Sequence, residues 1–298
     1  MGAHHHHHHH IDPEAGDRRV AWAVGVNMLL TVAQIVGGIV SGSLALVADA
    51  IHNFSDAISL IVALVARRIA RRPSDARMTF GYHRAEIVAA MVNYTTLIVI
   101  ALYLIYEAVL RLVDPPGVTG WIVVVVAAIA LVVDVITALL TYAMSKSSVN
   151  IRAAFLHNVA DALGSVAVIV AGTLILIYDW RLIDPLVTLG IAVYILWHVA
   201  QDIGPVIRML MMGGPDAPGL GDVRARLMAE DGVEDLHHLH LWQIDEHRTA
   251  FEAHVVMAED AGFAALTARL KRVLLQEFGI AHATLEVETV ASGCADPR

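Results

Sequence analysis

Six long runs of apolar residues, each containing few charges, fill the first two thirds of the chain. A helix needs about 20 apolar residues to cross a bilayer, so each run predicts one membrane-spanning helix. We therefore expect a six-helix transmembrane domain over residues 17–213. The runs lie near residues 20–40, 44–66, 86–112, 118–143, 153–177 and 183–207.

The polar and apolar positions change their spacing after Gly213. Helical spacing is expected over 221–230 and 261–278, and strand-like alternation over 233–244, 249–257 and 283–290. The order αββαβ predicts a small α+β domain over residues 214–292, in which two helices cover one face of a three-stranded sheet. Residues 293–298 are expected to form a flexible tail.

Composition supports a location in lipid for most of the chain. Of its 298 residues 57% are hydrophobic and only 16% are charged, and the mean hydropathy is +0.63, whereas a soluble domain carries about 25% charged residues.

Seven consecutive histidines near the start indicate an expression tag and scar over residues 1–16, which leaves ten of the 17 histidines as candidate site residues. The single cysteine, Cys294, excludes a disulfide within the chain and disfavours a thiolate metal site.

The basic residues predict the orientation of the helices. If the N-terminus is cytoplasmic, eleven Lys and Arg residues fall in or beside inside loops, against only Arg111 and Arg181 outside. This bias predicts a multi-pass protein of the inner (plasma) membrane with both termini in the cytoplasm.

The C-terminal part of the chain is acidic. Residues 214–298 contain 15 acidic and 7 basic residues, a balance that suits divalent cations and argues against nucleic acid as a partner.

Two pairs of ionisable residues interrupt the second and fifth apolar runs. His52 and Asp56 form one pair, and His157 and Asp161 form the other; each pair is spaced i, i+4, so its members share a helix face. Ionisable groups at membrane depth are costly and mark functional sites. Two imidazoles and two carboxylates can form a tetrahedral shell for a zinc-like cation. Hydrogen-bonded bracing of the helices is the alternative, but such pairs contribute only about 0.6 kcal/mol on average.

Several motifs resemble those of the cation diffusion facilitator family. They are the stretches 43–56, 80–86 (Phe-Gly-Tyr-His-Arg-Ala-Glu) and 155–165, together with Asp184-Pro185 and His238-Leu-His240-Leu-Trp242. The resemblance covers nearly all of the chain after the tag. It implies a homodimeric exporter of divalent cations, driven by proton exchange, whose cytoplasmic domain is metallochaperone-like (ferredoxin-like). His-x-x-x-Asp on both helices goes with zinc in this family, often with cobalt or cadmium as well.

Two further carboxylates and the linker after the second run are additional candidates for metal or proton binding. Asp49 lies three residues before His52 and is expected to orient a ligand, accept a proton or start a helix. Asp184 is expected to relay protons or shape the outer vestibule, or to cap the sixth helix. Some members of the family carry a further metal site in this linker. Here Met78 and Tyr82 stand where those members have histidines, so only Asp75 and His83 remain as possible ligands. The alternative is that His83 helps to start the third helix.

A histidine-rich cluster is expected in the C-terminal domain. His238 and His240 share one face of a predicted strand, while His237 points the other way. His254 lies on the next strand, and His282 and Glu286 lie on the last one. We expect these strands to bring together a regulatory zinc site over His238, His240, His254, His282 and Glu286, for which the family analogy implies His240, His254 and Glu286; plain surface histidines are the alternative.

The sequence thus predicts a proton-coupled antiporter that exports Zn²⁺, with Co²⁺ and Cd²⁺ as further substrates. Zinc is both the substrate and the expected regulator, and the partners are divalent cations, protons, the lipid bilayer and a second copy of the chain. A membrane-anchored metal sensor and a membrane-embedded metallohydrolase compete with this hypothesis. A hydrolase needs an open metal position with a general base beside it, and no Glu neighbours the tetrad in sequence, so we expect no enzyme activity.

Overall fold

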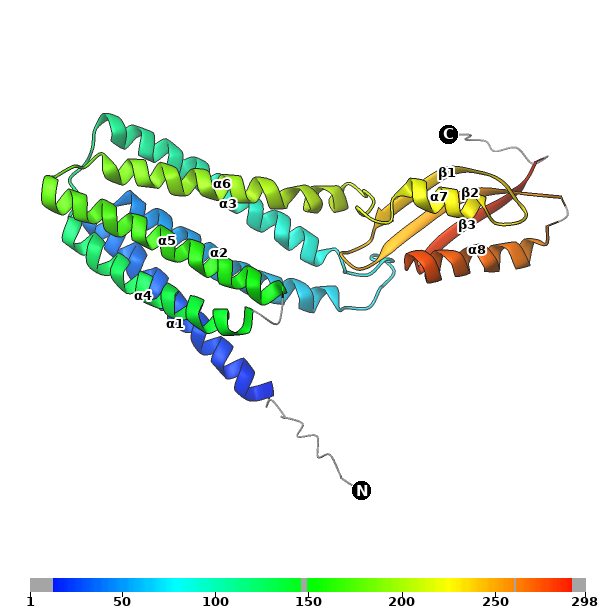
Figure 1. Ribbon diagram of the computed structural model, residues 1–298, viewed down its shortest axis with the longest axis horizontal. Helices are drawn as coiled ribbons and strands as arrows, with labels where there is room; N and C mark the ends of the chain where they lie inside the picture. The colour runs from blue at the N-terminus through cyan, green and yellow to red at the C-terminus, as the bar shows by residue number, and fades with distance from the viewer. Residues whose placement is uncertain (1–12, 146–148, 260, 291–298) are drawn as a thin grey trace, which may run out of the picture. The chain divides into compact units, whose positions relative to one another are not determined.

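The computed structural model describes residues 13–145, 149–259 and 261–290. The predicted elements are present in the predicted order, with ends that differ by a few residues (Figure 1). The six apolar runs form α1 (Pro13–Ser41), α2 (Leu44–Ala70), α3 (Ala85–Val113), α4 (Gly120–Ser145), α5 (Val149–Tyr178) and α6 (Ile183–Leu210). The C-terminal elements are α7 (Leu220–Met228), β1 (Val233–Gln243), β2 (Thr249–Met257), α8 (Phe263–Phe278) and β3 (His282–Thr289). The expected tag and the tail over 293–298 lie largely or wholly outside the described residues.

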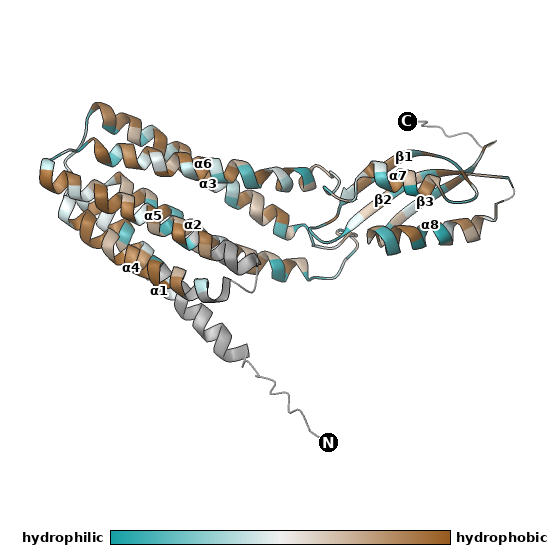
Figure 2. Cartoon of the chain, viewed as in Figure 1, coloured by the Kyte–Doolittle hydropathy of each residue, from teal (hydrophilic) through white to brown (hydrophobic). Residues whose placement is uncertain are grey.

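Helices α2 to α6 each contain a stretch long and apolar enough to cross a bilayer. The apolar part of α1 within the described residues is the shorter Met28–Ser41. Hydrophobic residues, brown in Figure 2, predominate on the described parts of these helices, with hydrophilic residues interspersed among them. The helical membrane-type domain followed by a small mixed α+β domain confirms the predicted fold class.

The chain divides into two compact units. The first unit contains the residues through Ile61 together with Thr95–Val199, and the second contains Val62–Tyr94 together with the residues from Ala200 onward. Each of the helices α2, α3 and α6 therefore has one end in the first unit and its other end in the second. Each unit has buried apolar residues of its own, and each is described separately below.

The first unit is packed around small and β-branched side chains. Ala45 and Leu46 of α2 are fully buried against α4 and α5, together with Val123, Ala127 and Val168. Two glycines allow α4 and α5 to approach closely: a Cβ on Gly120 would lie 2.7 Å from the carbonyl oxygen of Gly172, and a Cβ on Gly172 would lie 2.9 Å from Val123 Cγ1. Close backbone approach through small residues is typical of membrane helices, where dispersion contacts replace the hydrophobic effect.

In the second unit, the C-terminal elements form a three-stranded sheet in the order β1-β2-β3. Strand β2 pairs antiparallel with β1 and parallel with β3. Alternate residues of β1 and β2, such as Leu236, Phe251 and Val255, are buried in one core with α7 and α8. Both helices contribute to that core, as predicted, so the remaining alternate side chains of the sheet point to its opposite face.

Candidate metal sites

The first site begins with a contact between α2 and α5. His52 Nε2 lies 3.4 Å from Asp161 Oδ1, and the two side chains are 17% and 11% exposed. The ring of Tyr194, on α6, meets the His52 ring edge-on with 6.4 Å between centroids. The i, i+4 spacing places Asp56 and His157 one turn away on the same two helices, but their side chains lie outside the described residues. The structure thus joins one member of each predicted pair.

Two more carboxylates lie on the helices around this contact. Asp49 is 3% exposed, and its Oδ2 accepts a 2.8 Å hydrogen bond from Gln34 of α1. A Cβ on Gly164 of α5 would lie 3.1 Å from Asp49 Oδ1, so the α5 backbone passes close to this carboxylate. Asp134 of α4 accepts a 2.9 Å hydrogen bond from the Ser165 hydroxyl. Asp49 is thus held by a side chain of another helix and lies beyond the start of α2, which excludes the helix-start alternative; its role beside His52 stays a prediction.

Asp184 has a role that the sequence did not indicate. Its carboxylate, 1% exposed, accepts hydrogen bonds from the Leu44 N–H at 2.8 Å and from the Ser43 hydroxyl. Leu44 is the first residue of α2 and Ser43 directly precedes it, and the N–H groups in the first turn of a helix have no partner within the helix. Asp184 therefore caps α2, a neighbouring helix, rather than its own helix α6, and its negative charge favours the N-terminal end of the α2 dipole.

The linker residues Asp75 and His83 are not brought together as ligands. Asp75 accepts hydrogen bonds from the Tyr82 hydroxyl at 2.6 Å and from the backbone N–H groups of Arg77 and Met78. These bonds, that of Tyr82 foremost, hold the pKa of Asp75 below its usual value, and the same bond raises the pKa of Tyr82. His83 Nδ1 instead lies 3.8 Å from Asp245 Oδ2, after β1. Asp75 thus folds the linker, which supports the non-metal alternative for this segment.

A second candidate site lies on the sheet face opposite the two helices of the small domain. His237, His254 and Glu288 each direct one ligand atom to a common point, and these atoms lie within 4.8 Å of one another. His254 Nδ1 lies 2.6 Å from Glu288 Oε1, and His237 Nε2 lies 3.6 Å from Glu288 Oε2. Two imidazoles and one carboxylate match the donor types of zinc and fill three of its four usual positions. In the part of the chain that the structure describes, this is the one group of at least three such residues so closely spaced.

Three of the predicted residues border this trio. The His238 ring lies 4.8 Å from the rings of both His240 and His254, measured between centroids. Glu286 Oε2 lies 3.5 Å from His254 Nε2. His254 is therefore the predicted residue on which the cluster is centred, and His238, His240 and Glu286 lie around it.

The prediction that His237 points away from the cluster is wrong. The pairing of β1 with β2 slips between His237 and His240, and His238 has a positive φ of 50°. The extra residue of this bulge returns His237 to the face that carries His254, with 5.3 Å between their ring centroids. No turn residue in His237-His238-Leu239-His240 signals the bulge, so strict alternation gave the wrong face.

His282 lies away from this cluster. In the parallel pairing of β2 with β3, Ala250 is opposite His282, whereas His254 is opposite Glu286, four residues further along β3. The His282 ring contacts Phe80 of the linker instead, with 5.8 Å between centroids. Including His282 among the ligands was therefore an error of register, because sequence alone does not fix how two non-consecutive strands align.

Comparison with known proteins decides which family the chain belongs to. Residues 20–211 match the model of the cation efflux transmembrane domain, and residues 215–290 match that of the cation efflux protein cytoplasmic domain. The chain belongs to the cation efflux family. This confirms the resemblance read from the motifs, and it makes the chain a multi-pass membrane transporter rather than an enzyme.

Relatives within the family match over most of their length. The cadmium, cobalt and zinc/H(+)-K(+) antiporter of Bacillus subtilis is 36% identical over 87% of this chain and 85% of its own. The metal cation efflux system protein CzcD of Cupriavidus metallidurans is 34% identical over 95% of this chain and 90% of its own. The zinc transporter ZitB of Pectobacterium atrosepticum is 36% identical over 92% of this chain and 87% of its own.

Proposed function

We propose that this member of the cation efflux family exports Zn²⁺ from the cytoplasm in exchange for protons, through a metal site formed by His52, Asp56, His157 and Asp161. The observation that supports it is the 3.4 Å approach of His52 Nε2 to Asp161 Oδ1 between α2 and α5. The names of the relatives add zinc, cadmium and cobalt as metals that similar proteins carry. Imidazole donors favour zinc and cobalt over magnesium and calcium, which prefer all-oxygen shells.

Proton exchange follows from the chemistry of these ligands. A histidine binds a metal only as the neutral imidazole and an aspartate only as the carboxylate, so zinc and protons compete for the same groups. Zinc entering from the cytoplasm displaces protons from the four side chains. When the helices expose the site to the opposite side, protons displace zinc and return inward. The proposed location is the inner membrane, with both termini in the cytoplasm.

The small domain is proposed to bind a second zinc ion through His237, His254 and Glu288. Its role is regulatory: zinc there stabilises one arrangement of two copies of the chain, and that arrangement favours transport. The match of residues 215–290 to the cytoplasmic domain of the family supports pairing of two chains. His238, His240 and Glu286 are available around the trio to complete the zinc shell.

Zinc flux into proteoliposomes tests the proposed transport site. Uptake is followed with a trapped zinc-sensitive dye, with and without an imposed pH gradient. Asp161→Asn removes a charged ligand at nearly constant volume and should reduce uptake at least about 100-fold, because even partners beyond the ligands contribute 10–100-fold to metal affinity. Asp202→Asn is the matched control, an exposed aspartate of α6, and should keep its uptake.

Three results would contradict the proposal. Normal uptake by Asp161→Asn, with normal incorporation into the liposomes, would remove Asp161 from the site. Uptake that ignores the pH gradient would remove the proton exchange. No uptake of any divalent cation by the unaltered chain would favour a membrane-anchored sensor.

A further inference from the structure

A basic pocket lies in the second unit, between the linker that follows α2 and the β1–β2 hairpin with the start of β3. It encloses 560 Å³. The 15 residues that line it include three arginines and three histidines but neither Asp nor Glu. We define the basic pocket by its six basic residues, which are Arg71, Arg72, His83, His247, Arg248 and His282.

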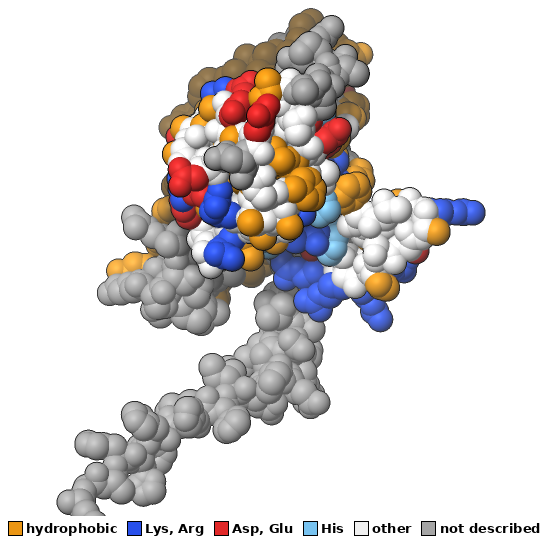
Figure 3. Space-filling model, turned by 90° about the vertical axis from the view of Figure 1, so that its right-hand side faces the viewer, with side chains coloured by type: hydrophobic (Ala, Val, Ile, Leu, Met, Phe, Trp, Pro, Cys, Tyr) orange, Lys and Arg blue, Asp and Glu red, His pale blue; other side chains and the backbone are white. Residues whose placement is uncertain are grey.

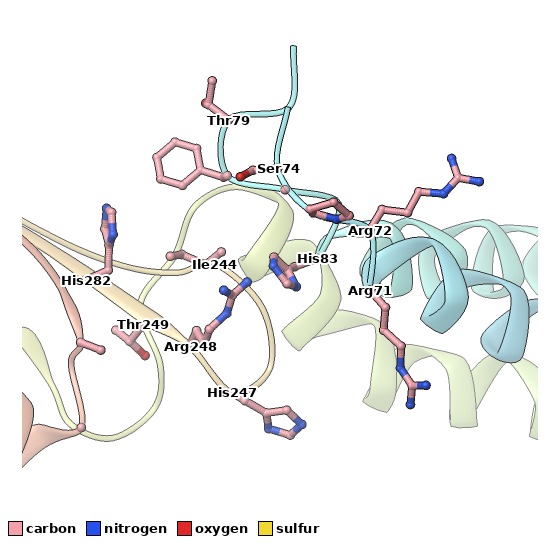
Figure 4. Close-up of a pocket in the computed structure, with 15 residues that line it drawn as sticks. Arg71, Arg72, Ser74, Thr79, His83, Ile244, His247, Arg248, Thr249 and His282 are labelled. Carbon is pink, nitrogen blue, oxygen red and sulfur yellow. The ribbon is translucent and has the colours of Figure 1, made fainter. Parts of the chain in front are cut away.

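Side chains in the middle of this space and at its rim carry hydrogen-bond donors. Figure 4 shows Arg248 and His83 pointing toward one another near its middle, whereas Arg71 and Arg72 extend outward along its rim. The hydroxyls of Ser74, Thr79 and Thr249 also line it. A guanidinium donates five hydrogen bonds and accepts none, and its planar fork suits phosphate oxygens. On the face seen in Figure 3, histidine side chains likewise lie beside Lys and Arg.

The carboxylate of Asp245 balances charge at the middle of this pocket, since it lies 3.8 Å from His83 Nδ1 as well as beside Arg248. Arg248 pairs with Asp245, with 2.7 Å between Nε and Oδ2. Among the described residues, Arg71 and Arg72 have no acidic side chain within 4.0 Å. Glu86, Asp245 and Glu246 line an adjoining cavity, which shares Arg71, His83 and His247 with this pocket. The uncompensated charge therefore belongs to the two arginines that directly follow α2.

The walls of the pocket are held by hydrogen bonds. The Arg84 guanidinium donates from Nη2 to the Gln243 carbonyl at 3.1 Å and from Nε to the Ile244 carbonyl at 3.3 Å, which joins the start of α3 to the end of β1. The Tyr82–Asp75 bond folds the linker itself, and Phe80 packs against His282. The basic side chains thus project from a formed scaffold.

We propose that the basic pocket binds a phosphate-bearing anion, and that the membrane supplies it as the headgroup of an anionic phospholipid. Arg71 follows directly on Ala70, the last residue of the membrane-spanning helix α2. Positively charged residues next to a membrane helix on the cytoplasmic side attract anionic lipids, by about 1 kcal/mol for each residue. A bound headgroup would tie the linker, and through Arg248 the hairpin of the small domain, to the membrane surface.

The test measures lipid binding by the full-length chain in neutral detergent, with fluorescent short-chain phosphatidylglycerol and phosphatidylcholine as probes. Arg71→Gln/Arg72→Gln should weaken phosphatidylglycerol binding at least about 10-fold, because a hydrogen bond to a charged group contributes about 1.5–3 kcal/mol and 1.4 kcal/mol corresponds to a factor of ten. The matched control is Arg68→Gln/Arg77→Gln, which removes the same charge from exposed arginines of the same segment that do not line the pocket. It should weaken binding less than about threefold, because the pocket stays intact and only unspecific attraction between charges is reduced. Arg72→Gln alone, at the rim, provides a milder variant if the double variant fails to fold.

Each outcome either identifies the source of the anion or shows that the pocket does not bind one. Phosphatidylglycerol binding that millimolar glycerol phosphate and inorganic phosphate fail to displace supports a lipid headgroup. Displacement by either soluble phosphate keeps the anion site but overturns the lipid as its source. Equal losses in the two double variants, or equal binding of phosphatidylglycerol and phosphatidylcholine, would overturn the pocket altogether.

Discussion

Replacing Asp184 separates a structural role from a role in transport. The carboxylate is buried and accepts hydrogen bonds from the Leu44 N–H, the Ser43 hydroxyl and, at 3.4 Å, the Ala45 N–H. Asp184→Ala leaves the buried Leu44 N–H without its partner, which costs about 1–3 kcal/mol. The Ser43 hydroxyl loses its acceptor as well, which adds about 1 kcal/mol, so we expect a total of roughly 2–4 kcal/mol. Asp184→Asn keeps one acceptor oxygen and should cost about half as much.

The assay is thermal unfolding of the purified chain in detergent, combined with zinc binding. Asp184→Ala should lower the unfolding midpoint by roughly 5–15 °C, Asp184→Asn by less, and neither should change the zinc affinity of the folded protein. Asp179→Asn is the control, because Asp179 is an exposed residue of the neighbouring loop that pairs with Arg181, and such pairs contribute less than about 1 kcal/mol. An unchanged midpoint together with lost zinc transport in Asp184→Ala would refute the capping role and return Asp184 to the transport path.

Two other predictions concern the second unit. In a chain that also carries Asp161→Asn, His254→Ala should weaken zinc binding at least about 10–100-fold in equilibrium titrations, whereas His282→Ala should leave it unchanged; equal effects would contradict the assigned trio. Asp75→Asn replaces the charged acceptor that raises the pKa of Tyr82 by a neutral amide, so the phenol should titrate closer to its ordinary value of 10.0, measured by NMR of labelled tyrosine. Because the pKa of Asp75 is lowered, its contribution to linker stability is present above its ordinary value of 3.8 and is lost as the pH falls through the lowered pKa. A Tyr82 pKa that does not respond to Asp75→Asn would contradict the bond.

The sequence predicted the helices well because lipid imposes one simple rule on them. A span needs a long apolar run, and every backbone polar group must be satisfied within the helix. The sequence also predicted the turn over residues 41–43 correctly. In the structure α1 ends at Ser41, α2 begins at Leu44, and Gly42 between them has a positive φ. In the small domain, alternation and helical spacing gave the order of the elements and the apolar residues of its core.

What the sequence missed depends on three-dimensional pairing. The bulge at His238 reverses the face of His237, and the register of β3 places His282 four residues away from the point opposite His254. Asp184 caps a helix 140 residues earlier in the chain, which no local spacing reveals. In the membrane domain, the i, i+4 spacing indicated a shared face on each helix, but the approach of His52 to Asp161 depends on how α2 and α5 pack.

Zinc stoichiometry is the most direct test of the transport site. The full-length chain carrying His237→Ala and His254→Ala, which removes the proposed regulatory site, is equilibrated with zinc at neutral pH, and the bound metal is counted for each chain. We expect one remaining zinc ion per chain, which is lost on adding His52→Ala and is released when the pH is lowered. Zinc that remains bound after His52→Ala, or no zinc bound before it, would contradict a transport site built on His52 and Asp161.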